Sequence, residues 1–171
     1  STENVNLEFK TTQVRADGDC LFHSLAIILR ARGISTSAAQ LRQNIAHHGL
    51  VSSEQHLDQV YSKPKARLLW LDMANKGVWD SAAGDQIVSI ASQNILKPII
   101  VISRNREQKL QALLIDGHSH ADELPSNVDR NPVVLFRSTN HFEPVYKINR
   151  DSWKKVVDLM KKEDKVIYTL M

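Results

Sequence analysis

Cysteine is nearly absent from this chain, which has a single one, Cys20, among 171 residues. One cysteine excludes an internal disulfide and is typical of a reducing compartment, so we expect a cytoplasmic protein. Long apolar runs are missing as well, since no stretch approaches the roughly 20 residues that span a bilayer. The first residues contain no apolar segment of the kind found in a secretory signal. The sequence therefore predicts no membrane insertion.

A dominant sign of charge is also lacking, because 22 Lys and Arg residues stand against 19 Asp and Glu residues, a net charge of +3. Even the lysine-rich stretch 154–165 contains carboxylates, so the cations form no continuous block. Interspersed charge of this kind is typical of a solvated surface and not of a nucleic-acid-binding protein. We therefore expect no nucleic-acid partner.

The remaining composition, 42% hydrophobic and 24% charged, is ordinary for a globular protein and sets disorder aside. A chain of 171 residues is long enough to fold without a metal or disulfide, and no repeat or linker divides it. We expect a single domain over 1–171, with a core at about 12–148 and a C-terminal helix at about 152–163. The start at Ser1 instead of Met indicates a segment cut from a longer protein.

Helical periodicity dominates the first half of the chain. Residues 21–32 carry apolar side chains at helical spacing, and Gly33 follows as a stop signal. Ser37, with Gln40 three positions later, is typical of a capping box and predicts a second helix that Gly49 ends.

Two more helices are predicted before the pattern changes, at 54–76 with an interruption at Pro64 and at 80–94. After Pro98, residues 99–103 form a continuous apolar run rich in β-branched residues, which predicts a buried strand. Further strands are predicted at 110–115, 132–136 and 142–148, and residues 1–13 are predicted to be a peripheral strand or tail. Helices followed by strands favour an α+β fold in which helices pack around a small β-sheet.

The final predicted helix is amphipathic, with Trp153, Val156 and Met160 at helical spacing. These side chains are predicted to pack on the core, although such a helix can instead dock a partner.

The most informative segment is Asp17-Gly18-Asp19-Cys20, a turn followed by the first turn of a predicted helix. The dipole and free N–H groups of a helix start stabilise a thiolate, so we expect a lowered pKa and a nucleophilic sulfur at Cys20. The N–H groups of the loop 17–20 are also candidates to bind the oxyanion of an acyl-transfer intermediate. Gly18 permits the turn that aims them.

A thiolate nucleophile needs a base, and His141 is the best candidate because it stands at the mouth of the last predicted strand. Residues two apart on a strand share a face, so Glu143 can reach back and orient the imidazole. Glu143 can instead be a solvent-facing strand residue. His23, one helical turn after Cys20, is a rival base. Asn140 is an alternative orienting group, unless the site works as a Cys20–His141 dyad.

A second polar cluster, 116–123, contains His118 and His120, and a His-x-His pair beside carboxylates can ligate zinc. Gly117 and the mixed polarity favour an exposed loop instead. We therefore expect no metal site and no cofactor.

The two boxes around the cysteine and the histidine resemble those of the ovarian-tumour (OTU) cysteine proteases, most of which are deubiquitinases. The sequence Asp-Gly-Asp-Cys-Leu-Phe at 17–22 is similar to the Asp-Gly-x-Cys nucleophile box of that family. The sequence His-Phe-Glu at 141–143 is similar to its His-aromatic-acid/amide box. Trp79, a following helix and the Pro-Ile-Ile-Val of 98–101 look like the family's central Trp, helix and strand. The similarity covers about 12–148.

The resemblance implies a papain-type cysteine protease fold and hydrolysis of isopeptide bonds at the C-terminal glycine of ubiquitin or a ubiquitin-like modifier. It assigns Cys20 as nucleophile and His141 as general base, and it gives Asp17 a part in shaping the oxyanion loop. The family usually has Asp or Asn where this chain has Glu143, whose carboxylate stands one methylene further out.

The implied partners are ubiquitin or polyubiquitin chains, with the protein itself a monomer. A catalytically inactive ubiquitin-binding module of the same fold is the alternative, and the presence of both Cys20 and His141 favours the enzyme. A viral or bacterial effector with this activity would work in the cytosol of its host.

Overall fold

The computed structural model describes residues 7–52, 62–117, 131–139, 141–162 and 166–168. Its helices are α1 (Cys20–Ala31), α2 (Ala38–Val51), α4 (Lys63–Met73), the short 3-10 helix η1 (Ser81–Ala83), α5 (Gly84–Ile95) and α6 (Arg150–Lys162). Its strands are β1 (Phe9–Thr11), β2 (Ile99–Arg104), β3 (Leu110–Asp116), β4 (Val133–Ser138), β5 (His141–Ile148) and β6 (Val166–Tyr168). The predicted α+β class is confirmed.

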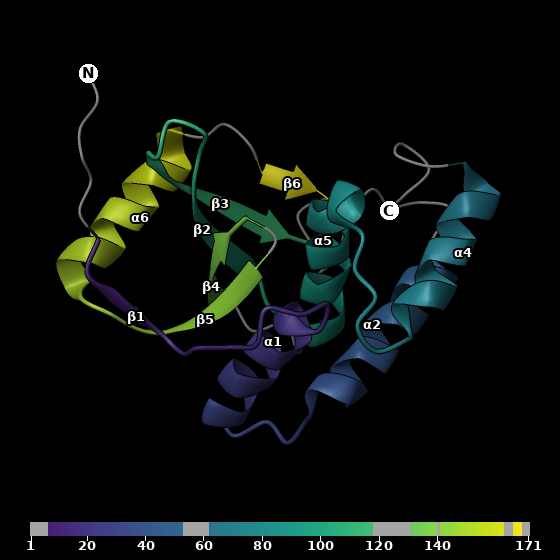
Figure 1. Ribbon diagram of the computed structural model, residues 1–171. Coiled ribbons are helices and arrows are strands. Elements are labelled where there is room, and N and C mark those ends of the chain that lie inside the picture. Colours follow the sequence, from purple (N-terminus) through teal and green to yellow (C-terminus); the bar gives the residue numbers. More distant parts are fainter. Residues whose placement is uncertain (1–6, 53–61, 118–130, 140, 163–165, 169–171) are drawn as a thin grey trace.

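The strands form one six-stranded sheet in the order β1-β5-β4-β2-β3-β6. Neighbouring strands are antiparallel except for the pairs β2–β4 and β3–β6, which are parallel. Figure 1 shows α6 on one side of the sheet and the helices α1, α2, α4 and α5 grouped on the other. Helix α1 packs against β5, and this contact brings the start of α1 next to the start of β5.

The central strand β2 shows why its sequence is apolar without alternation. Ile99 and Val101 belong to the core beneath α1, α2, α4 and α5. Ile100 and Ile102 point to the other face and pack with Val156 of α6. Because helices cover both faces of the sheet, every side chain along this part of β2 is buried.

The predicted elements correspond closely to those observed, but one breaker residue, Gly49, was misread. Gly49 was predicted to end the second helix, and it lies inside α2, which continues to Val51. A Cβ at position 49 would overlap the ring of Trp70, so this glycine lets α4 pack closely on α2. Pro64 was predicted to interrupt the helical region 54–76, and it stands in the first turn of α4, where its missing N–H removes no helical hydrogen bond. The part of that region at 54–61 lies outside the described residues.

The other local signals agree with the structure. The Ser37 side chain accepts the N–H of Gln40 at 3.1 Å and caps α2 as predicted. The segment predicted as one helix at 80–94 is divided into η1 and α5, and Asp80 caps η1 by accepting the N–H of Ala83 at 3.2 Å. Strand β6 was not predicted, because three residues are too few to show a period. Across the described ranges, no helix has both the length and the apolar content to cross a bilayer.

Candidate active site

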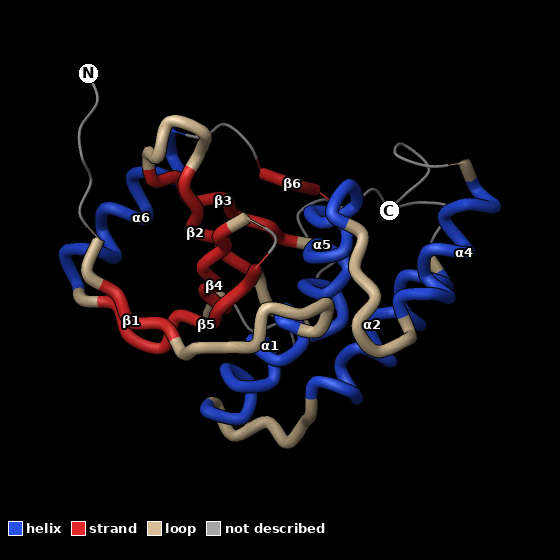
Figure 2. The backbone as a smooth tube through the Cα atoms, viewed as in Figure 1, coloured by secondary structure: helices blue, strands red, loops and turns tan. Residues whose placement is uncertain are grey.

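Cys20 is the first residue of α1 and follows an irregular segment, drawn tan in Figure 2. Asp17 holds the turn before it in two ways. Its side chain accepts the N–H of Asp19 at 2.9 Å, and its carbonyl accepts the N–H of Cys20 at 3.3 Å. Two hydrogen bonds from Asp17 therefore fix the shape of the loop 17–20.

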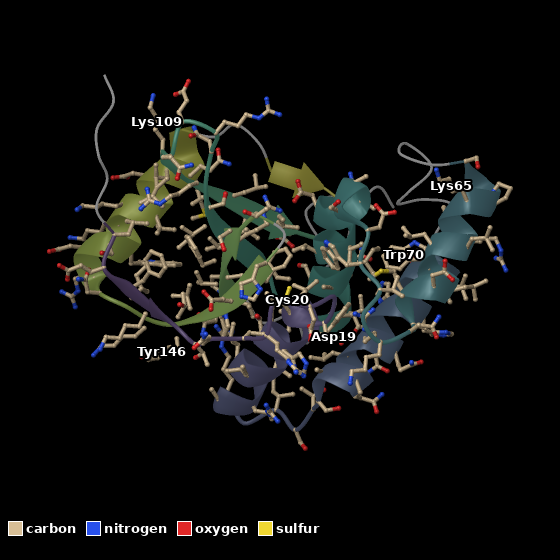
Figure 3. All side chains as sticks on the ribbon, viewed as in Figure 1. Asp19, Cys20, Lys65, Trp70, Lys109 and Tyr146 are labelled. Atoms are coloured by element: carbon tan, nitrogen blue, oxygen red, sulfur yellow. The ribbon has the colours of Figure 1, made fainter. Side chains whose placement is uncertain are left out.

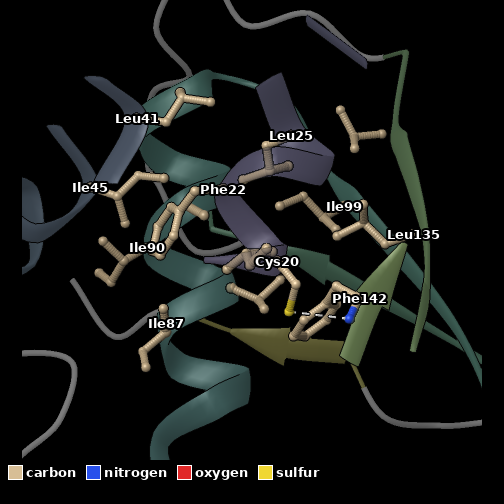
Figure 4. Packing of buried hydrophobic residues seen from close by; sticks show 14 of the residues in the cluster. Cys20, Phe22, Leu25, Leu41, Ile45, Ile87, Ile90, Ile99, Leu135 and Phe142 are labelled. Atoms are coloured by element: carbon tan, nitrogen blue, oxygen red, sulfur yellow. Dashed lines mark hydrogen bonds between the residues drawn. The ribbon is translucent and has the colours of Figure 1, made fainter. Parts of the chain in front are cut away.

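The Cys20 side chain is only 4% exposed and lies against the start of β5. The N–H of Phe142 donates to its Sγ at 3.4 Å (Figure 4). Burial raises the pKa of the Cys20 thiol, and the Phe142 N–H acts in the opposite direction without cancelling this effect. The prediction of a lowered pKa at Cys20 is wrong, because removal of the sulfur from water outweighs the stabilisation at the helix start.

This burial predicts the pH dependence of alkylation. The thiolate is the form that reacts with iodoacetamide, and the pKa of Cys20 is raised from its ordinary value of 9.0. We therefore expect the labelling rate of the folded protein to keep rising as the pH passes 9. Mass spectrometry reads the modification without ambiguity because the chain has one cysteine. Circular dichroism at each pH checks that the chain stays folded, and a rate that levels off near neutral pH would contradict the prediction.

His141 is the first residue of β5 and is half-buried. Its Nε2 lies 3.8 Å from Oε2 of Glu143, and both side chains are 21% exposed. Its Nδ1 is buried and has no hydrogen-bond partner in the described part of the chain. Because the next residue, Phe142, contacts the Cys20 sulfur, the backbone of β5 holds His141 and the thiol in the same region.

A cleft of about 440 Å³ opens beside these residues. The loop before α1 lines it through Asp17 and Gly18, the segment after α4 lines it through Gly77 and Trp79, and β5 lines it through His141. Two glycines let two backbone segments of the cleft wall approach each other closely. A Cβ at position 18 would overlap the carbonyl of Gly77, so only glycine fits there. Trp79 packs edge-on against Phe142, with 5.7 Å between ring centroids.

Sequence reasoning missed the residue that holds the loop 17–20 to the rest of the fold. Arg42 of α2 and Asp19 form an ion pair that is almost fully buried, with Nη2 2.7 Å and Nε 2.9 Å from Oδ1 of Asp19. The same oxygen accepts the N–H of Gly77 at 3.1 Å. Burial by itself raises the pKa of Asp19, but the Gly77 N–H and Arg42 together bring that pKa below 3.8.

The donors of Arg42 also join two segments of backbone. They bind the carbonyls of Gly18, Met73 and Val78, so one guanidinium connects the loop before α1 to both ends of the segment after α4. The only signal in the sequence was the helical position of Arg42, which lies three and four residues before the buried Ile45 and Ala46 and so shares their side of the helix. In a sequence, a single arginine beside the apolar residues of a helix is more simply interpreted as exposed to solvent.

The remaining candidates lie elsewhere. His23 is exposed on α1 and does not line the cleft. Asn140, His118 and His120 lie outside the described residues. Gly117 was predicted to belong to an exposed loop, and it is buried, with its N–H bound to Ser92 and its carbonyl to Gln93. No three possible metal ligands come together among the residues that the structure describes.

No protein-family model matches the sequence, and no curated protein matches it either. The fold does match solved structures, and they define its class: this is the fold of OTU domains, as the sequence motifs predicted.

Three of these structures illustrate the likeness. An OTU deubiquitinase from Wolbachia pipientis wMel is 16% identical, with a TM-score of 0.60, and the match covers 86% of this chain and 95% of that one. An OTU domain in complex with ubiquitin is also 16% identical, with a TM-score of 0.60 and coverage of 90% and 83%. The viral OTU domain protease from Dera Ghazi Khan virus is 15% identical, with a TM-score of 0.57 and coverage of 83% and 82%.

Proposed function

We propose that this protein is a thiol-dependent deubiquitinase that hydrolyses isopeptide bonds at the C-terminal glycine of ubiquitin or a ubiquitin-like modifier. The observation that carries the proposal is the contact between the Cys20 sulfur and the backbone of Phe142. It joins the nucleophile box to the histidine box beside a cleft that glycine backbone lines. The fold supports the same conclusion, since solved structures that share it include OTU deubiquitinases and OTU domains bound to ubiquitin.

In this proposal Cys20 attacks the carbonyl carbon of the glycine while His141 removes the thiol proton. Nε2 of the imidazole faces Glu143, and Nδ1 is buried without a partner among the described residues. We therefore assign Nδ1 as the atom that accepts the thiol proton. The imidazolium then gives this proton to the leaving lysine amine, and a thioester to Cys20 remains. A water molecule, activated by His141, hydrolyses the thioester and releases ubiquitin with a free carboxylate.

The oxyanion formed in each step needs a hydrogen-bond donor in the cleft. In the loop 17–20, Asp17 already holds the N–H groups of Asp19 and Cys20, and its own N–H donates to Arg15. Among the described residues, the N–H of Gly18 donates to no other group, and Gly18 lines the cleft. We therefore assign the Gly18 N–H as an oxyanion donor, with Asp17 and Asp19 shaping the loop that presents it.

The raised pKa of the Cys20 thiol agrees with general-base catalysis. A thiol that stays protonated at neutral pH needs His141 to take its proton during the attack.

Ubiquitin with an electrophile at its C-terminus tests the proposal, because covalent capture requires a nucleophilic sulfur aligned with the tail. We expect one adduct, located at Cys20, that forms equally well in the presence of a metal chelator. Ubiquitin that binds the protein without forming an adduct would favour the inactive ubiquitin-binding module. A panel of differently linked di-ubiquitins then identifies the linkage that is cut.

Glu143→Ala is expected to lower kcat/KM on a ubiquitin–fluorophore substrate about tenfold. We propose that the Glu143 carboxylate orients the imidazole from 3.8 Å. A charge-assisted contact of this kind contributes about 1.5 kcal/mol at the low end of its range, which is close to one decade in rate. Glu143→Gln is expected to lose less, because an amide oxygen keeps a hydrogen-bond acceptor at the same position, facing the imidazole.

Glu107→Ala is the matched control, since this carboxylate is exposed and pairs with Lys109 in the β2–β3 turn. Wild-type activity in Glu143→Ala would remove Glu143 from the mechanism and leave Cys20 and His141 as a dyad.

A further inference from the structure

A second cleft lies away from the candidate active site, at the opposite end of β5. It has a volume of about 490 Å³ and lies where β5 ends and α6 begins. We call it the basic groove and define it by Arg32, Tyr146, Lys147, Arg150 and Trp153, which line it together with neighbouring apolar residues. At about 3.3 Å per residue, the β5 residues that line the groove, 145–148, lie roughly 13–23 Å along the strand from His141. Figure 3 shows Tyr146 well apart from Cys20.

The charge of the basic groove has one sign. Arg32, Lys147 and Arg150 line it, and no carboxylate does. The side chains of Lys147 and Arg150 are exposed, and within the described ranges neither has an ion-pair partner. The nearby Glu8 is already bound to the side chain of Asn149.

The neighbouring strand adds a further cation. In the antiparallel pairing of β1 with β5, Lys10 lies directly opposite Lys147, and both are exposed. Like charges placed opposite each other on one sheet face are destabilising. A folded chain that concentrates positive charge here in spite of this cost is suited to a negatively charged partner.

The walls of the groove add an apolar component. Tyr146 is 60% exposed, so much of its aromatic ring is open to solvent. Trp153 is half-buried, and Val134 and Ile148 line the groove beside it. Tyrosine, tryptophan and arginine are the residues that contribute most at protein–protein contacts. A ligand that fits this surface carries negative charge together with an aliphatic or aromatic side chain.

We propose that the basic groove binds an extended acidic segment of a partner protein, one that alternates carboxylates with apolar side chains. The carboxylates meet Lys147, Arg150 and the remaining donors of Arg32, of which two already bind the carbonyls of Asn131 and Pro132. An apolar side chain packs between Tyr146 and Trp153. The groove is remote from the cleft beside Cys20, so this inference does not depend on the proposed function.

Fluorescence anisotropy with a fluorescein-labelled peptide of alternating glutamate and leucine tests the proposal on the full chain. We expect saturable binding that weakens as NaCl is raised, because added salt screens exposed charges. A peptide with lysine in place of glutamate should not bind. The double variant Lys147→Glu/Arg150→Glu should weaken binding at least tenfold, and Tyr146→Ala should weaken it severalfold.

The matched control is Arg67→Glu/Arg106→Glu, which makes the same change in net charge at exposed positions on α4 and in the β2–β3 turn. It should change binding less than twofold. Equal losses in the two double variants would overturn the proposal, because general attraction would then explain the binding. Absence of peptide binding would also overturn it. So would tighter binding of single-stranded DNA or anionic vesicles than of the peptide, if the variant Lys147→Glu/Arg150→Glu abolishes that binding. Thermal unfolding checks that each variant is folded. The binding assay gives its answer whether or not the protein is a deubiquitinase.

Discussion

Cys20→Ala is expected to abolish hydrolysis of ubiquitin–fluorophore substrates, with a loss of at least about 10⁴-fold in kcat. No other cysteine in these 171 residues can replace the nucleophile. The chain should stay folded, because only a sulfur atom is removed, at a cost of about 1 kcal/mol for the lost burial. Ubiquitin should still bind, since a surface much larger than one sulfur recognises it.

The contact from Phe142 allows a sharper version of this experiment. Alanine leaves the buried N–H of Phe142 without its acceptor, whereas the hydroxyl of Cys20→Ser can still accept it. An unsatisfied buried donor costs about 1–3 kcal/mol, so the serine variant should unfold at a higher temperature than the alanine variant. Both variants should be inactive, because an alcohol is a far weaker nucleophile than a thiol at neutral pH. Turnover that survives in either variant would place the chemistry at another residue.

Arg42→Met is expected to destabilise the fold more than any surface substitution. Methionine preserves much of the volume but leaves Asp19 buried without its partner. Breaking a buried ion pair in this way costs about 3–5 kcal/mol. For a chain of this size each kcal/mol corresponds to roughly 2–4 °C, so the Tm should fall by about 6–20 °C. Differential scanning calorimetry measures both quantities.

Two further variants distinguish the cost of an unpaired buried charge from the cost of replacing any arginine. Arg137→Met breaks an ion pair with Asp85 that is partly exposed, and it should cost no more than about 1 kcal/mol. In the double variant Arg42→Met/Asp19→Asn, part of the lost stability should return, because no unpaired charge remains in the interior. Equal effects of Arg42→Met and Arg137→Met would show that the buried pair is not a major contributor.

The same pair has a pH signature. The pKa of Asp19 is lower in the folded chain than its ordinary value of 3.8, so its ionised form stabilises the fold above that pH. As the pH falls through the folded pKa, this contribution disappears. The stability difference between the wild type and Asp19→Asn should therefore shrink in acid.

Local patterns in the sequence predicted most of the elements, because they depend on neighbours along the chain. The apolar run of β2 and the cap at Ser37 are examples. Gly49 was misread because its role is to admit Trp70, a residue of another helix. Arg42 was missed for the same reason, since its partners lie in two segments, 18–19 and 73–78, that are distant from it in the sequence.

The candidate site shows the same division. The sequence motifs pointed to Cys20 and His141 as the candidate residues. They also correctly predicted that the loop 17–20 comes directly before a helix. The direction of the pKa shift of Cys20 could not be predicted, because it depends on how deeply β5 and α1 bury the sulfur. Burial is a property of the assembled fold, and no pattern within a few residues of Cys20 reports it.

The depth of the Cys20 sulfur bears on how long the protein survives oxidants. Hydrogen peroxide attacks thiolates and converts them to sulfenic acid, which a second thiol can rescue by forming a disulfide. These 171 residues offer no second thiol, so a sulfenic acid at Cys20 has no resolving partner among them and can proceed to irreversible sulfinic acid. A buried sulfur with a raised pKa exposes little thiolate to peroxide. The packing that buries Cys20 thus also shields the proposed nucleophile during oxidative stress.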